Sequence, residues 1–139
     1  MTETKARPRL LLVDDDQALL DLMQSRLLAL GAFEVFQTTK GRDVLARLAE
    51  IRPDLIISDI DMPGMDGGAL AAALKEREAG RRIPILFLSS MISLAESDAG
   101  RGHVGGWPML SKKTSFDKLV KAIDQSLEEA AARAQEKRA

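Results

Sequence analysis

Residues 53–67 read PDLIISDIDMPGMDG, and they place a short apolar run directly before a polar loop. The run Leu55–Ser58 has the length and composition of a strand that is buried on both faces, and Asp59 ends it. Ile60–Gly68 contains one proline and three glycines, so we expect a loop there. Strands buried on both faces are typical of parallel sheets that are covered by helices.

The same pattern, an apolar run that ends in polar residues, recurs on both sides of this stretch. The other predicted strands are Arg9–Val13, Phe33–Gln37, Pro84–Leu88 and Met109–Ser111. Helical spacing of apolar residues predicts helices at Gln17–Leu30, Gly41–Ile51, Ala69–Arg77 and Ser115–Ala134, with a turn and a half of helix at Leu94–Ala99. Alternating strands and helices predict a doubly wound α/β fold, (βα)5, with five parallel strands.

Composition excludes several classes of function. The 139 residues are about the size of one domain, and the formal net charge of −1 favours neither nucleic acid nor an anionic membrane as a partner. The absence of cysteine excludes thiol catalysis and cysteine-ligated metals, and one histidine, His103, cannot form a histidine-rich metal site. No apolar run approaches the ~20 residues that span a bilayer, and the N-terminus lacks the apolar segment of a signal peptide. We therefore expect a cytoplasmic protein.

Polar side chains follow four of the predicted strands. They are Asp14-Asp15-Asp16, Asp59, Ser89-Ser90 and Lys112-Lys113. The carboxyl ends of parallel strands share one edge of a sheet, where ligands bind, and carboxylates gathered there repel one another unless a cation lies between them. Mg²⁺ prefers such oxygen ligands. A nearby hydroxyl and ammonium would complete a site for phosphoryl oxygens, with a carboxylate as the acceptor.

Taken singly, these residues have ordinary explanations. Asp16 is favoured as a helix N-cap, and Asp14, Asp15 or Asp59 alone could cap a helix or be solvated. Ser89 alone would be a hydrogen-bonded hydroxyl, Lys112 alone a surface lysine, and His103 a loop residue. Their joint position at successive strand ends favours a functional site over these separate explanations.

The segments Leu10–Asp16, Pro53–Gly67 and Pro84–Ser90 resemble the receiver domains of two-component response regulators. The resemblance covers residues 8–127, and its most specific part is the D-x-x-M-P-x-M-D-G loop that begins at Asp59. It implies a flavodoxin-like fold with strand order 2-1-3-4-5. It also implies a stand-alone, chemotaxis-regulator-like receiver, with residues 1–7 as a tail and residues 128–139 as a fraying helix extension without an output domain.

The resemblance implies a role for each matched residue. Asp59 would accept the phosphoryl group. Ser89 would hydrogen-bond that group, and Lys112 would pair with its oxygens. The implied Mg²⁺ ligands, with Asp15 favoured as a direct one, are Asp14, Asp15, Asp59 and the backbone carbonyl of Asp61.

The sequence departs from the family pattern at three places. Met109 stands where the family usually has a switch aromatic, and Trp107 precedes Pro108 and has no assured place in a strand. Lys113 follows Lys112 in place of the usual proline, so the cis bond of the family is disfavoured, and Lys113 is itself an alternative active-site lysine. The glycine-rich stretch Asp98–Trp107 occupies the place of the fourth helix.

The implied function is signalling rather than enzymatic turnover, apart from self-catalysed phosphorylation and dephosphorylation. A sensor histidine kinase or a histidine phosphotransfer protein would donate the phosphoryl group, and the face formed by residues 92–127 would bind a downstream protein. We expect phosphorylation to order residues 92–108. The alternatives are an unphosphorylated pseudo-receiver scaffold and, with less support, a phosphatase that uses the D-x-D motif Asp59–Asp61.

Overall fold

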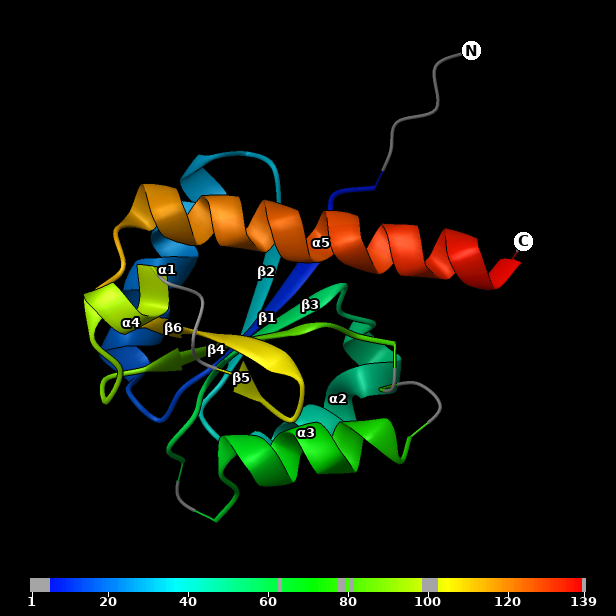
Figure 1. Cartoon of the computed structure of the whole chain (residues 1–139), viewed down its shortest axis with the longest axis horizontal. Helices are drawn as coiled ribbons and strands as arrows, with labels where there is room; N and C mark the ends of the chain where they lie inside the picture. Colours follow the sequence, from blue (N-terminus) through cyan, green and yellow to red (C-terminus); the bar gives the residue numbers. More distant parts are fainter. Residues whose placement is uncertain (1–5, 63, 78–79, 81, 99–102, 139) are drawn as a thin grey trace.

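A computed structural model describes residues 6–62, 64–77, 80, 82–98 and 103–138 (Figure 1). Five strands run parallel in the order β2-β1-β3-β4-β6, as predicted. Their bounds are β1 Arg9–Val13, β2 Glu34–Thr38, β3 Leu55–Asp59, β4 Ile85–Ser89 and β6 Trp107–Ser111. The doubly wound, flavodoxin-like fold is therefore confirmed.

Helices cover both faces of the sheet. Figure 1 shows α1 and α5 on one side and α2 and α3 on the other, with α4 beside the sheet edge. Their bounds are α1 Gln17–Ala29, α2 Gly41–Ile51, α3 Gly67–Lys75, α4 Leu94–Asp98 and α5 Phe116–Arg138. None of the helices in the described part of the chain is both long enough and apolar enough to cross a membrane.

The core consists of two apolar layers, one on each face of the sheet. Alternate residues of β1 enter opposite layers: Leu10 and Leu12 pack with α1 and α5, whereas Leu11 and Val13 pack with α2 and α3. Both sets are fully buried, which explains why these strands are continuous apolar runs without alternation. Each fully buried leucine of this kind stabilises the fold by roughly 1.5–3 kcal/mol.

A sixth strand, β5 (His103–Val104), pairs antiparallel with β6 at the sheet edge and was not predicted. Gly105 and Gly106 join the two strands with positive φ angles of 58° and 88°, the conformation of a tight two-residue hairpin turn. These glycines belong to the glycine-rich stretch Asp98–Trp107 that replaces the fourth helix of the family, and no hairpin was predicted from them; Gly100 and Gly102 lie outside the described residues. The strand β6 consequently begins at Trp107 and includes Pro108, two residues earlier than predicted.

The last helix is longer than expected. We predicted a helix over Ser115–Ala134, and α5 continues to Arg138 and extends past the sheet in Figure 1, whereas the fraying of residues 128–139 stays a prediction. Leu127 packs against the core, and the guanidinium of Arg133 lies 5.5 Å from the centre of the Trp107 ring. Alanine and glutamate also have high helix propensity. Local propensity and this cation–π contact therefore replace the large apolar side chains whose absence suggested fraying.

Candidate functional site

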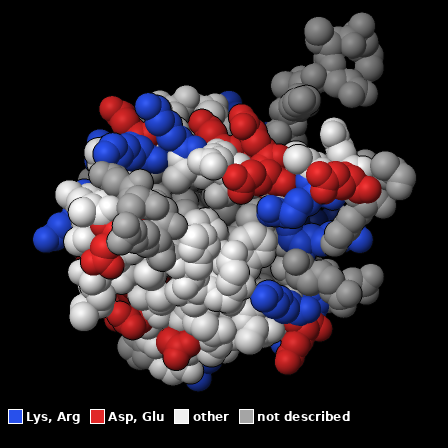
Figure 2. Space-filling view, in the orientation of Figure 1, with Lys and Arg blue, Asp and Glu red and all other residues white. Residues whose placement is uncertain are grey.

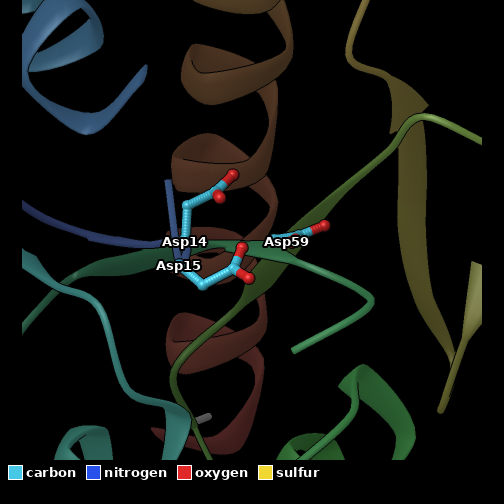
Figure 3. A group of neighbouring side chains, drawn as sticks. All are labelled: Asp14, Asp15 and Asp59. Carbon is cyan, nitrogen blue, oxygen red and sulfur yellow. The ribbon is translucent and has the colours of Figure 1, made fainter. Parts of the chain in front are cut away.

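Strand register brings the predicted polar residues to one edge of the sheet. Val13 pairs with Ser58, and Asp59 pairs with Leu88, so the residues that follow β1, β3 and β4 come together. Figure 3 shows Asp14 and Asp15 leaving the end of β1 beside Asp59 at the end of β3. The carboxylates are thus supplied by neighbouring strands.

Three carboxylates are close enough to share a metal ion. One oxygen from each of Asp14, Asp15 and Asp59 lies within 4.8 Å of the others. Asp14 is 3% exposed and Asp59 is 7% exposed, whereas Asp15 faces solvent. Such an all-oxygen set of two buried ligands and one solvent-facing ligand fits Mg²⁺, which retains several waters when it binds to proteins.

Lys112 lies between the two buried carboxylates. Its Nζ is 3.0 Å from Asp14 Oδ2 and 3.3 Å from Asp59 Oδ1. The backbone N–H of Lys112 donates to the Ser89 carbonyl at 2.9 Å, which fixes this residue at the end of β4. Lys113 is exposed, and no cis peptide bond occurs in the described residues. The geometry therefore places Lys112, not Lys113, in the cluster.

Burial and the neighbouring charge of Asp14 raise the pKa of the Asp59 carboxyl, and Lys112 only partly opposes this shift. Burial alone would lower the pKa of Lys112, but the hydrogen bond and charge of Asp14, together with Asp59, outweigh it and raise that pKa. Lys112 is therefore held as a cation, and the site retains an excess of negative charge.

Asp61 and Ser89 lie next to the carboxylate cluster, but their side chains form no hydrogen bond with it in the described structure. The backbone N–H of Asp61 donates weakly to Asp59 Oδ1 at 3.4 Å. The Ser89 hydroxyl accepts a hydrogen bond from the Met91 N–H at 3.0 Å. Both residues line a cavity of about 400 Å³ that also contains Met109, so Ser89 has space beside it at the position of the family's switch residue.

The loop after β3 is anchored by buried contacts. Met62 is 7% exposed and packs with α2 and α3, as does Met65. Asp66 caps α3 by accepting from the Ala69 N–H at 2.8 Å. Gly67 packs so closely that a Cβ there would lie 2.9 Å from Phe87 Cε1. These contacts give a structural reason for the methionines, the aspartate and the glycine of the motif.

The end of β2 also lies at this edge of the sheet, although it was not predicted to. Thr38 pairs with Val13, so Thr39 and Lys40 lie level with the two aspartates that follow β1. The signal was present, because Thr38-Thr39-Lys40 also follows an apolar strand, but the residues carry no carboxylate and did not stand out.

A family model described as the response regulator receiver domain matches residues 10–124. The chain belongs to this family. Receiver domains are signalling domains of two-component systems, and Mg²⁺ binding at an acidic pocket is typical of them. Such domains are not conventional enzymes.

Known relatives agree with this assignment. The chain is 31% identical to protein PilG of Pseudomonas aeruginosa, with 83% of this chain and 84% of PilG covered. The chemotaxis protein CheY4 of Vibrio cholerae has a similar structure, with a TM-score of 0.73, 30% identity, and coverage of 87% of this chain and 99% of that one.

Other relatives are much longer. The chain is 36% identical over 122 residues to the transcriptional regulatory protein GlrR of Escherichia coli, with 88% of this chain covered but only 27% of GlrR. It covers 39% of the transcriptional regulatory protein PrrA of Mycobacterium leprae. The chain thus spans well under half the length of these curated relatives.

Proposed function

We propose that this receiver accepts a phosphoryl group on Asp59 from a phosphohistidine and signals by changing its contacts with a partner protein. The observation that carries the proposal is the bridging position of Lys112, whose Nζ contacts both Asp14 and Asp59. A lysine held there supports one phosphoryl oxygen while the carboxylate cluster holds a cation for another.

The transfer is an in-line displacement at phosphorus. An Asp59 carboxylate oxygen forms the new O–P bond, and the P–N bond to the donor imidazole breaks as that nitrogen takes the electron pair and then a proton. Lys112 donates hydrogen bonds to the phosphoryl oxygens, and Ser89 can turn its hydroxyl from the Met91 N–H toward them. Positioning and charge stabilisation supply most of the catalysis in such reactions.

Asp14, Asp15 and Asp59 would hold Mg²⁺, with the backbone carbonyl of Asp61 as a further ligand. When bound, the ion neutralises negative charge on the transferring phosphoryl group. In its absence, Lys112 is the cation that offsets the cluster.

The donor would be a sensor histidine kinase or a histidine phosphotransfer protein, and residues 8–127 would be the receiver unit. The downstream partner would bind the face formed by residues 92–127. On the face shown in Figure 2, acidic and basic side chains are interspersed and neither sign forms a continuous patch. That mixture favours a protein partner over nucleic acid on this face.

The test is intact mass spectrometry after incubation with Mg²⁺ and acetyl phosphate. We expect a gain of about 80 Da, the mass of one phosphoryl group, in the wild type and none in Asp59→Asn. A gain in the Asn variant would show that the acceptor lies elsewhere. A wild type that stays unmodified, with phosphohistidine donors as well, would favour the pseudo-receiver scaffold, and catalytic turnover of the donor would favour a phosphatase.

A further inference from the structure

A buried serine directly precedes Lys112 and accepts two backbone hydrogen bonds from the turn that carries this lysine. Ser111 ends β6 and is 1% exposed. Its hydroxyl oxygen accepts from the Lys113 N–H at 3.0 Å, and its carbonyl accepts from the Thr114 N–H, also at 3.0 Å. Residues 111–114 therefore form a β-turn, with Lys112 and Lys113 as its two central residues.

The backbone of Lys112 is held from both sides. On the side of the sheet, Ser111 pairs with Ser89, and the Lys112 N–H donates to the Ser89 carbonyl at 2.9 Å. On the side of the turn, the next two backbone N–H groups both donate to Ser111, one to its hydroxyl and one to its carbonyl. Three successive N–H groups are thus bonded, and Lys112 keeps little backbone freedom.

The hydrogen bond to the Ser111 hydroxyl requires a residue with an N–H at position 113. Neither Lys112 nor Lys113 has a positive φ, which excludes turn types II, I′ and II′ and fits a type I turn. Serine is favoured at the first position of such a turn, whereas proline is disfavoured at the third and has no N–H to donate. Lys113, which departs from the family pattern, and Ser111 therefore complement each other.

The Lys112 side chain must keep one direction for its ammonium to remain in the cluster. Its Nζ lies 3.0 Å from Asp14 Oδ2 and 3.3 Å from Asp59 Oδ1, but the side chain is 24% exposed, so packing alone does not fix it. A lysine stem is flexible and loses much rotamer entropy when it is held. The direction in which the stem leaves the backbone is set by the turn.

We infer that Ser111 is a positioning residue, whose hydroxyl holds the Lys113 N–H and so directs the Lys112 ammonium onto Asp14 and Asp59. The inference rests on the proposed function and adds to it the residue that keeps the phosphoryl-binding cation in place. Ser111 acts through Lys112 rather than on the phosphoryl group. Removing its hydroxyl leaves the bond from Lys112 to Ser89 in place, so the expected loss is partial.

The first experiment measures the rate at which acetyl phosphate with Mg²⁺ phosphorylates the full chain. We expect Ser111→Ala to be about fivefold slower than the wild type, the effect of one hydrogen bond, and Ser111→Thr, which keeps the hydroxyl, to recover most of the rate. The matched control is Ser115→Ala. The Ser115 hydroxyl accepts from the Lys118 N–H at 3.3 Å at the start of α5, so this variant also loses a backbone hydrogen bond but keeps the turn, and its rate should stay within about twofold.

The second experiment does not depend on phosphoryl transfer. NMR spectra are recorded on protein labelled with ¹³C at the lysine Cε, without divalent cations, and the Lys112 signal is identified by its absence in Lys112→Met. The two Cε protons of a lysine held between carboxylates have separate shifts, whereas a freely rotating stem averages them. We expect separate shifts in the wild type, Ser111→Thr and Ser115→Ala, and converged shifts in Ser111→Ala.

The outcomes separate the positioning role from the proposed function. If the wild type is not phosphorylated, the proposed function fails, and the NMR spectra still decide whether Ser111 positions Lys112. Separate shifts in Ser111→Ala, a wild-type rate in that variant, equal slowing of Ser115→Ala, or a folded Ser111→Thr that is no faster than Ser111→Ala would overturn the inference. If the added methyl of Ser111→Thr prevents folding, the contrast between the two alanine variants decides alone.

Discussion

Asp59 carries an electrostatic conflict at the scale of a single residue. It is 7% exposed and adjacent to Asp14, and both features raise its pKa. In the native state the carboxyl therefore binds a proton more readily than in the unfolded chain. Its ionised form destabilises the fold, an effect that is absent below the unfolded pKa and complete once the pH exceeds the raised native pKa.

Asp59→Asn should therefore stabilise the protein at pH 7 without divalent cations, by about 1 kcal/mol, the size of a typical single-residue effect. The gain should vanish in acid, where the wild-type carboxyl is itself protonated. Thermal melts in a chelator at both pH values measure this. Asp16→Asn removes the same charge from an N-cap that tolerates asparagine, so it should show little change, and a lower melting temperature for Asp59→Asn at pH 7 would contradict the prediction.

The two adjacent lysines, Lys112 and Lys113, should contribute very differently to the stability of the fold. Lys112→Met leaves Asp14 and Asp59 buried without their cation, so we expect a loss of about 2 kcal/mol in a chelator, below the value for fully buried pairs because the lysine is partly exposed. Millimolar Mg²⁺ should restore part of it, because a bound cation replaces the ammonium. Lys113→Met should stay within about 0.5 kcal/mol. Denaturant melts with and without Mg²⁺ check this, and equal effects would contradict the placement of Lys112.

At the scale of elements, the loop between β3 and α3 is held by close packing. Gly67 begins α3 with Ile60 Cγ1 at 2.8 Å and Phe87 Cε1 at 2.9 Å from the position of a Cβ. Phe87 is fully buried in β4, and close-packed interiors leave a buried ring little freedom to shift. The contact sets how closely α3 approaches the sheet, and so the course of the loop that carries Asp61.

Gly67→Ala should therefore destabilise the fold by about 1–3 kcal/mol, the usual result of overpacking. The neighbouring Gly68 supplies a matched control, since a Cβ there would lie 3.4 Å from Asp66 Oδ1, an ordinary contact distance. Gly68→Ala should be neutral or stabilising by about 0.5–1 kcal/mol, because alanine favours helix. Urea denaturation of both variants tests the pair. Similar stabilities would contradict the prediction, because they would show that the loop shifts to accommodate a Cβ at position 67 at little cost in free energy.

At the scale of the whole molecule, the proposed signalling would carry a change at Ser89 to the face formed by residues 92–127. Ser89 and Met109 line the same cavity, and Met109 pairs with Phe87 across the sheet. Met109 is unbranched and adaptable, so it defines one of two states poorly. The change is then expected to spread through backbone order at residues 92–108, of which 99–102 lie outside the described residues, rather than through a ring flip.

Hydrogen exchange on the free and beryllofluoride-bound protein tests this expectation. Protection should rise most in residues 92–98, where α4 is only five residues long, and less in Trp107–Ser111, which the sheet already protects. Asp59→Asn supplies the control, because it removes the acceptor oxygen. High protection of residues 92–98 in the free protein, unchanged on binding, would rule out the order–disorder mechanism.

Much of the fold and site follows from the sequence by itself. Strands such as Leu55–Asp59 are apolar on both faces, and helices have a period of 3.6 residues, so both are local patterns. The acidic residues could be assigned to one edge because all parallel strands end on the same side. The resemblance then supplied a role for each residue, which the chain's membership of the receiver family supports without testing each role.

Only the tertiary structure decided the rest. The sequence does not distinguish the adjacent residues Lys112 and Lys113. The hydrogen bond from the Lys112 N–H to the Ser89 carbonyl decides which of the two ammonium groups enters the cluster. Lys40 lies beside Asp15 because of the register between β1 and β2, and that register is set by pairing between segments that are separated in the chain. The strand β5 is too short to leave a periodic pattern, and the contact between Arg133 of α5 and the Trp107 ring joins segments that no local pattern relates.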